Sequence, residues 1–178
     1  MIKMYKKIRH WLGREDGNST IEFVIWFPFF IGVFGSAFEA SFISVRQIML
    51  NSALDRTVRS LQLGELGTPS HSELKVIICN YAGFIPNCLN SLHIEQEIVQ
   101  TANFNFRKGQ VQCVDLDNNQ TPALNFSNGT TNDLMLITVC AAVRPMVPMT
   151  GLGLKLPKIN DGTNYAIVAF SAYVVEPV

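Results

Sequence analysis

The longest apolar stretch of the chain lies near its beginning. Residues 23–38 contain no charged side chain, Glu39 interrupts them, and small or apolar residues then continue to Val45. From there to Gly64, apolar residues recur at helical spacing with polar residues between them, which is typical of a helix with one buried face. The pattern predicts one helix over residues 18–63, about 70 Å long at 1.5 Å per residue. Its outer half should pack its apolar face on a globular head.

The rest of the chain predicts that head. Ser70 and Glu73 have the spacing of a capping box at the start of a second helix over residues 72–84. β-Branched or alternating runs predict strands at residues 92–101, 104–116, 134–143 and 165–175, the second being the weakest, with loops at 117–132 and 146–162. The expected fold class is α+β, in which a long N-terminal transmembrane and stem helix packs on a small antiparallel sheet of three or four strands.

Charge is distributed unevenly, although its total is zero. Residues 1–17 hold five basic and two acidic side chains, a net of +3, so the remaining 9 basic and 12 acidic side chains carry −3. A basic segment before an apolar span stays on the cytoplasmic side of a membrane. This organisation predicts a cytoplasmic leader (1–17), a transmembrane helix (18–45) and an exported domain (46–178), in which 46–63 continue the stem and 70–178 form the head. The arginines of the stem are expected on its solvated face; they are Arg46, Arg56 and Arg59.

Two residues of the apolar span are unusual for a plain anchor. Pro28 removes a backbone donor and should kink the helix, which membrane helices tolerate. The Glu22 carboxylate is costly in hydrocarbon, so it needs a partner unless it lies at the interface on the first helical turn. The span reaches the roughly 20 residues needed to cross a bilayer only if Glu39 lies near the outer interface. Three interpretations stay open: a secretory signal cut after Ala37, an uncleaved signal anchor, or the first helix of a pilin.

All four cysteines follow the apolar segment. An even number of cysteines beyond a membrane segment favours disulfides in an oxidising compartment over buried free thiols. The cheapest pairing joins Cys79 to Cys88 and Cys113 to Cys140. Four cysteines allow 3 connectivities, and the sequence does not decide among them.

The residues that open the apolar run resemble a type IV prepilin processing site. A basic leader ends in Gly17, and Glu22 is the fifth residue after it, followed by Phe23. The longer stretch over residues 14–45, with Pro28 inside the run and Glu39 near its end, resembles the TadE/TadG-like pseudopilins of the Tad (Flp) pilus system. Residues 165–177, which close on Glu-Pro, are similar to the end of TadE-like proteins.

The resemblance implies a role and a location. A prepilin peptidase would cut between Gly17 and Asn18, and Glu22 of one subunit, followed by Phe23, would neutralise the new amino group of a neighbour. The chain would be a single-pass protein of the bacterial inner membrane with its C-terminal domain in the periplasm, or would be carried into an extracellular pilus. Its partners would be the membrane, the peptidase and other pilins. Major Flp pilins are very short and carry Glu-Tyr here, so the expected role is that of a minor pseudopilin.

Other candidate chemistry is weak. No CxxC motif is present, and His71 and His93, which lack ligand spacing to the cysteines, are expected to be surface or cap residues. Asp115, Asp117 and Asn119 superficially suggest a calcium loop, but its glycine and glutamate positions hold Gln120 and Phe126, so we expect a solvated turn.

No catalytic constellation emerges, and no basic stripe with interleaved aromatic residues indicates nucleic-acid binding. We therefore expect no enzyme activity, metal, cofactor, nucleic acid or small-molecule substrate. The alternatives to a pseudopilin are an uncleaved, signal-anchored periplasmic binding protein and a secreted enzyme or adhesin released after Ala37. The site at which the chain is cut discriminates among the three.

Overall fold

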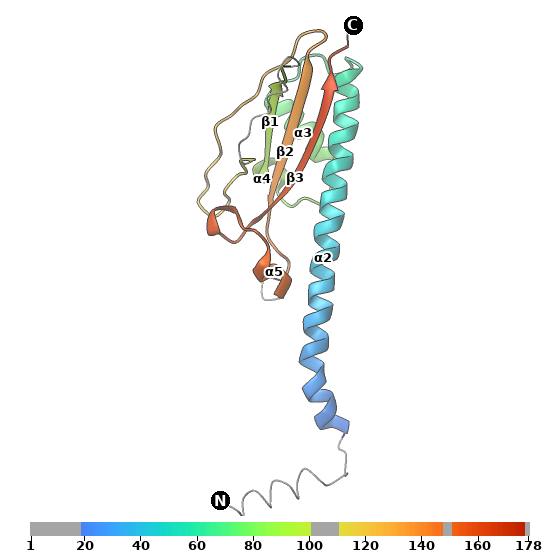
Figure 1. Cartoon of the computed structure of the whole chain (residues 1–178), viewed down its shortest axis with the longest axis vertical. Helices are drawn as coiled ribbons and strands as arrows, with labels where there is room; N and C mark the ends of the chain where they lie inside the picture. The colour runs from blue at the N-terminus through green and yellow to red at the C-terminus, as the bar shows by residue number, and fades with distance from the viewer. Residues whose placement is uncertain (1–18, 101–110, 148–150, 177–178) are drawn as a thin grey trace, which may run out of the picture.

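The computed structural model describes residues 19–100, 111–147 and 151–176. One long helix, α2 (Ser19–Gln62), extends well beyond a small head that packs against its second half (Figure 1). In chain order the head contains α3 (His71–Tyr81), α4 (Cys88–Ser91), β1 (Leu92–Ile98), β2 (Leu134–Val143), α5 (Gly151–Lys155), the 3-10 turn η1 (Ile159–Asp161) and β3 (Tyr165–Val174). The α+β fold with a long helix on a small antiparallel sheet is confirmed.

The two halves of α2 have different surroundings. Its 44 residues extend about 66 Å, and residues 19–38 have no buried side chain. From Glu39 onward, one stripe of the helix is buried at the three- and four-residue steps of a single helical face; it consists of Glu39, Arg46, Leu50, Ala53, Leu54, Thr57, Val58 and Leu61. Contact with the head thus begins at Glu39, before the boundary expected after residue 45. The helix ends just ahead of Gly64, whose φ of 72° favours glycine.

The sheet has three antiparallel strands in the order β1-β2-β3. The central strand β2 is buried on both faces over its last residues. Helix α2 packs on β3, α3 on β1 and α4 on β2, and the disulfide between Cys113 and Cys140 holds a loop against β2. The core lies between the sheet and helices α2 and α3, and its fully buried side chains include Leu50, Leu54, Leu74, Ile78, Leu92, Ile94, Met135, Ile137 and Ile167. This core fixes the head on the stem.

The predicted second helix is confirmed, capping box included. The Ser70 hydroxyl accepts from the Glu73 backbone N–H, and the Glu73 carboxylate accepts from the Ser70 backbone N–H at 2.8 Å. The helix ends at Tyr81, earlier than predicted, because Ala82 already leaves the helical conformation.

The strands predicted at 134–143 and 165–175 are confirmed, and that at 92–101 is confirmed as far as Ile98. The weakest of the predicted strands, over 104–116, is wrong in its described part: residues 111–116 form only one bridge, between Asp115 and Gln120. The rest of that range lies outside the described residues. Helix α5 and the turn η1 stand within the loop predicted over 146–162, and α4 lies between the predicted second helix and the first strand, where no element was predicted. Segments of three to five residues are too short to show a helical period.

Candidate functional site

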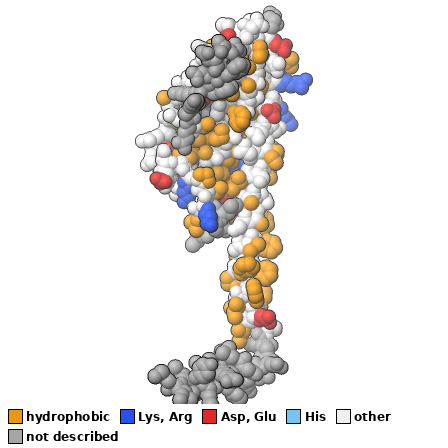
Figure 2. All heavy atoms as spheres, in the orientation of Figure 1, with side chains coloured by type: hydrophobic (Ala, Val, Ile, Leu, Met, Phe, Trp, Pro, Cys, Tyr) orange, Lys and Arg blue, Asp and Glu red, His pale blue; other side chains and the backbone are white. Residues whose placement is uncertain are grey.

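The first half of α2 carries a continuous run of exposed large apolar side chains, from Ile21 to Phe38. Phe23, Trp26, Phe30 and Phe34 are each 54–61% exposed, and Figure 2 shows hydrophobic side chains along the visible face of this bare part of the helix. Monomeric soluble proteins rarely leave an apolar surface of this extent uncovered. Residues 19–38 span about 30 Å, the thickness of the hydrocarbon core of a bilayer. The helix is therefore long and apolar enough to cross a membrane once.

The polar groups of this segment fit that environment. The Ser36 hydroxyl donates to the Gly32 carbonyl at 2.9 Å, so it needs no external partner in hydrocarbon. Pro28 leaves the carbonyl of Val24 without its usual helical donor, yet α2 remains one assigned helix through it; the kink stays a prediction. The position after Ala37, where one interpretation of the sequence places a signal-peptidase cut, lies inside the same helix.

The predicted processing and assembly residues lie at the tip of α2. Gly17 and Asn18 fall outside the described residues. Glu22 is exposed on the first turn of the helix, where the positive end of the helix dipole favours a carboxylate. Phe23 is 61% exposed and its ring lies 5.2 Å from that of Phe27. The tip thus presents one acid within an apolar surface.

The junction between the bare helix and the head is a set of buried polar contacts. Glu39 is fully buried and its carboxylate accepts from the backbone N–H groups of Met146 and Val147, each at 2.9 Å from Oε2. These two residues follow β2, so one carboxylate ties the loop at the base of the head to the helix. Glu39, which the sequence analysis places near the outer end of the span, is therefore covered by protein rather than exposed to lipid or water.

Arg46 lies two helical turns above Glu39 on the same face. Its guanidinium donates to the Tyr165 hydroxyl at 2.9 Å and to the Arg144 carbonyl at 3.3 Å, and it is only 8% exposed. Burial raises the pKa of the Tyr165 hydroxyl, and the hydrogen bond from Arg46 opposes that rise. The expectation that Arg46 belongs to the solvated face of the stem is wrong. Its seven-residue spacing from Glu39 was the available signal, because residues seven apart share a helical face.

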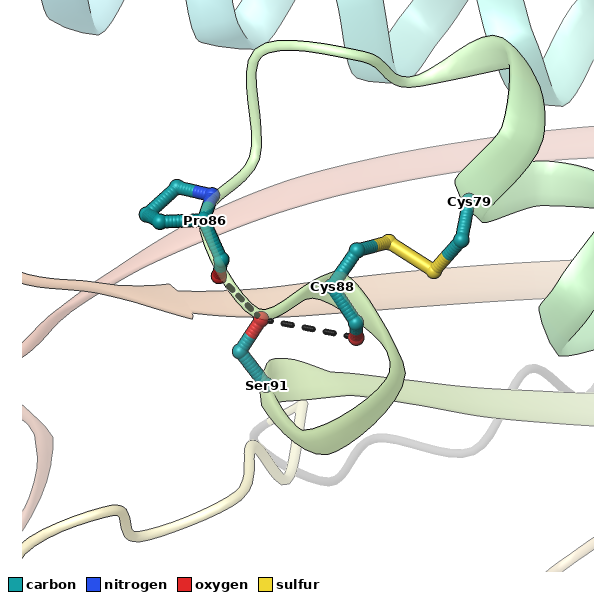
Figure 3. The surroundings of a disulfide bond; sticks show 4 residues. All are labelled: Cys79, Pro86, Cys88 and Ser91. Atoms are coloured by element: carbon teal, nitrogen blue, oxygen red, sulfur yellow. Dashed lines mark hydrogen bonds between the residues drawn. A yellow bond between two sulfur atoms is a disulfide. The ribbon is translucent and has the colours of Figure 1, made fainter.

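Both disulfides of the pairing that the sequence analysis calls the cheapest are present. Cys79 at the end of α3 is bonded to Cys88 at the start of α4, with Cα atoms 5.7 Å apart (Figure 3). Beside it the Ser91 hydroxyl donates to the Pro86 carbonyl at 3.3 Å, so the turn between the helices is held at two points. The second disulfide joins Cys113 to Cys140 on the central strand.

The turn predicted as solvated is in part a buried anchor. Asp115 is 3% exposed and accepts from the Asn160 side chain at 3.0 Å, while Asp117 accepts from the Thr163 backbone N–H at 2.6 Å. The hydrogen bonds from Asn160 and Asn118 lower the pKa of Asp115 to about 2. These carboxylates fasten the loop to the segment before β3. Within the described ranges, no group of three or more His, Cys, Asp or Glu residues could hold a metal ion.

The two head histidines lie together between α3 and β1. Their ring centroids are 6.4 Å apart. His93 is 5% exposed, so its predicted place at the surface is wrong, whereas His71 directly follows the cap residue of α3. Burial lowers the pKa of both imidazoles, and the charge of Lys75 lowers it further. Nothing in the sequence spacing of these residues indicated the pair, because it depends on how α3 packs on β1.

The fold and the junction define a class of protein: within the described residues, one helix suited to crossing a membrane is continuous with a stem that carries a disulfide-bonded α+β head. Comparisons of this chain with protein-family models, with curated proteins and with solved structures found no match. A more particular assignment therefore depends on the residues themselves.

Proposed function

We propose that this chain is a minor pseudopilin, a structural subunit that helps to assemble a Tad-type pilus or a related secretion apparatus. The observation that carries the proposal is the continuity of α2: a bare apolar half runs without interruption into a stem packed on an antiparallel sheet. A filament subunit with this geometry can pack its apolar helix among neighbouring helices while its head faces outward. The bilayer holds the same helix before assembly.

The placement of Glu22 supports the proposal. It lies at the exposed tip of α2, four residues after Asn18, the residue that would become the new N-terminus. A carboxylate in an apolar environment is strongly driven to find a positive partner. In the proposed assembly, the amino group released by cleavage after Gly17 on one subunit neutralises Glu22 on its neighbour.

The disulfides support export of the head. Structural disulfides persist in oxidising compartments such as the bacterial periplasm, and the basic leader keeps the N-terminus in the cytoplasm. We therefore place the head in the periplasm, with the leader in the cytoplasm and the bare half of α2 in the inner membrane.

The first test is N-terminal sequencing and intact mass of the protein from membranes of its native host. A start at Asn18 supports the pseudopilin. A start at Met1 contradicts processing and favours a signal-anchored periplasmic binding protein. A start at Phe38 indicates release by signal peptidase, which would leave Glu39 and the whole head in a secreted domain.

The second test replaces Glu22 with alanine in the host. Membrane insertion should persist, because the substitution makes the span more apolar, whereas assembly of the apparatus should be impaired. Glu22→Asp keeps the charge and is the matched control. Normal assembly of the Glu22→Ala protein would refute the role of this carboxylate.

A further inference from the structure

The base of the head carries an apolar surface with no role in the core. Met146 is 54% exposed, Val147 37% and Leu154 63%. The first two follow β2 and the third lies on α5, which contacts α2 at the lower end of the head (Figure 1). Exposed large apolar side chains gathered at one end of a domain indicate a partner surface.

The contacts of Glu39 fix the height of this surface along α2. Its carboxylate binds the backbone N–H groups of Met146 and Val147, and it directly follows Phe38, the last residue of the bare apolar segment. The segment of 20 residues before Glu39 spans about 30 Å, which is the hydrocarbon thickness. When that segment fills the bilayer, the base of the head therefore lies at the level of the lipid headgroups.

The charge of the same segment suits that level. Residues 144–158 contain three basic side chains, Arg144, Lys155 and Lys158, and no acidic one. Lys155 and Lys158 are exposed, and Arg144 forms an exposed ion pair with Asp117 at 3.4 Å. The backbone of Lys158 bridges Tyr165, the residue held by Arg46, so this lysine is attached to the same junction. Apolar side chains flanked by lysines are the composition of segments that lie in a membrane interface.

We propose that the base of the head, formed by Met146, Val147 and Leu154 with Lys155 and Lys158, rests on the outer leaflet of the membrane crossed by α2 and binds anionic phospholipid headgroups. Glu39 is the residue that holds this surface at the required height. The head then has two attachments to the bilayer, the span and the base, which fix its tilt. This inference rests on the anchoring part of the proposed function, not on cleavage or filament assembly.

Spin labels on single introduced cysteines test the inference, since all four native cysteines are paired in disulfides. The full chain is reconstituted at low protein-to-lipid ratio in vesicles of phosphatidylcholine with phosphatidylglycerol. Leu154→Cys reports the base, Phe30→Cys the span, and Leu63→Cys, just past the far end of α2, the aqueous phase. All three parent side chains are more than half exposed, and intact mass verifies that both disulfides have formed.

The readout is collision of the label with a water-soluble nickel complex compared with oxygen. The labels at positions 30 and 154 should both lose access to the nickel complex, whereas that at 63 should keep it. Adding Lys155→Glu and Lys158→Glu should restore nickel access at position 154 in the anionic vesicles and leave position 30 shielded.

Each other outcome overturns the inference in a distinguishable way. Nickel access at 154 with shielding at 30 means that the span inserts and the base stays in water. Nickel access at both positions refutes the anchor, and with it the inference. Dipolar broadening between labels at 154 means that a second copy of the chain covers the base. Shielding at 154 that survives both lysine reversals refutes headgroup recognition.

Discussion

Replacement of Glu39 tests the junction directly, because one buried side chain holds the base of the head to the helix. Its carboxylate accepts from the N–H groups of Met146 and Val147. Alanine at this position removes the carboxylate and leaves the backbone N–H groups of Met146 and Val147 without this acceptor. Glu39 is not one of the residues of the hydrophobic core, so we expect the main effect of the substitution at the polar junction.

The magnitude follows from the two lost hydrogen bonds. A buried donor left without a partner costs about 1–3 kcal/mol. Met146 and Val147 are 54% and 37% exposed, so water can reach part of this loop and the lower end of the range applies. We expect Glu39→Ala to destabilise the junction by about 2 kcal/mol, and Glu39→Gln, which keeps one acceptor oxygen, by about half of that.

Hydrogen exchange of the full chain in detergent measures this loss at the residues concerned. A local destabilisation of about 2 kcal/mol raises the exchange rate of the Met146 and Val147 amides roughly 30-fold. Glu65→Ala, at an exposed glutamate just past the end of α2, is the matched control and should change stability by less than about 0.5 kcal/mol. Unchanged exchange at both amides in Glu39→Ala would refute the assignment of Glu39 as the residue that holds the base of the head.

Three further predictions concern the head. Replacing Cys113 and Cys140 by alanine opens a loop of 27 residues and should lower the free energy of unfolding by roughly 3.5 kcal/mol, against roughly 2.6 kcal/mol for removal of the disulfide with a separation of 9. Denaturation followed by near-ultraviolet circular dichroism measures both losses, and a larger loss for the shorter loop would contradict loop closure as the cause. The lowered pKa of Asp115, about 2 against 3.8, means that its contribution to stability is complete above about pH 4 and is lost as the pH falls toward 2. Asp115→Asn should therefore flatten the acid branch of the unfolding midpoint, and an unaltered branch would contradict this. The pKa of His93 is lowered from 6.5, so the unfolded chain takes up the proton more readily and stability falls as the pH drops from about 7 toward 5; His93→Gln should reduce that slope, and an equal slope in both proteins would exclude His93 as its source.

The sequence alone was sufficient for the elements with long or strong patterns. The continuous apolar run and the amphipathic pattern after it predicted α2 and, to within one residue, where it ends, and the capping box predicted the start of α3. Strands β2 and β3 followed from runs of β-branched and aromatic residues. Short elements such as α4 and η1 were missed because their conformation depends on neighbours: a disulfide at Cys88, and the side chain of Asn160 bound to Asp115.

Local pattern determines whether a segment is helix or strand and which side chains are apolar, because these depend on periodicity and composition within a few residues. It therefore predicted the span, the stem and the exported head, and it drew attention to Glu22 and Glu39. Only the tertiary structure decided which polar side chains are buried. Glu39 and Arg46 meet partners 107 and 119 residues away, Met146 and Tyr165, and no local pattern specifies such distant pairs. A charged residue on a helix becomes part of a junction rather than a solvated face only when the packing of the head on that helix supplies hydrogen-bond partners for it.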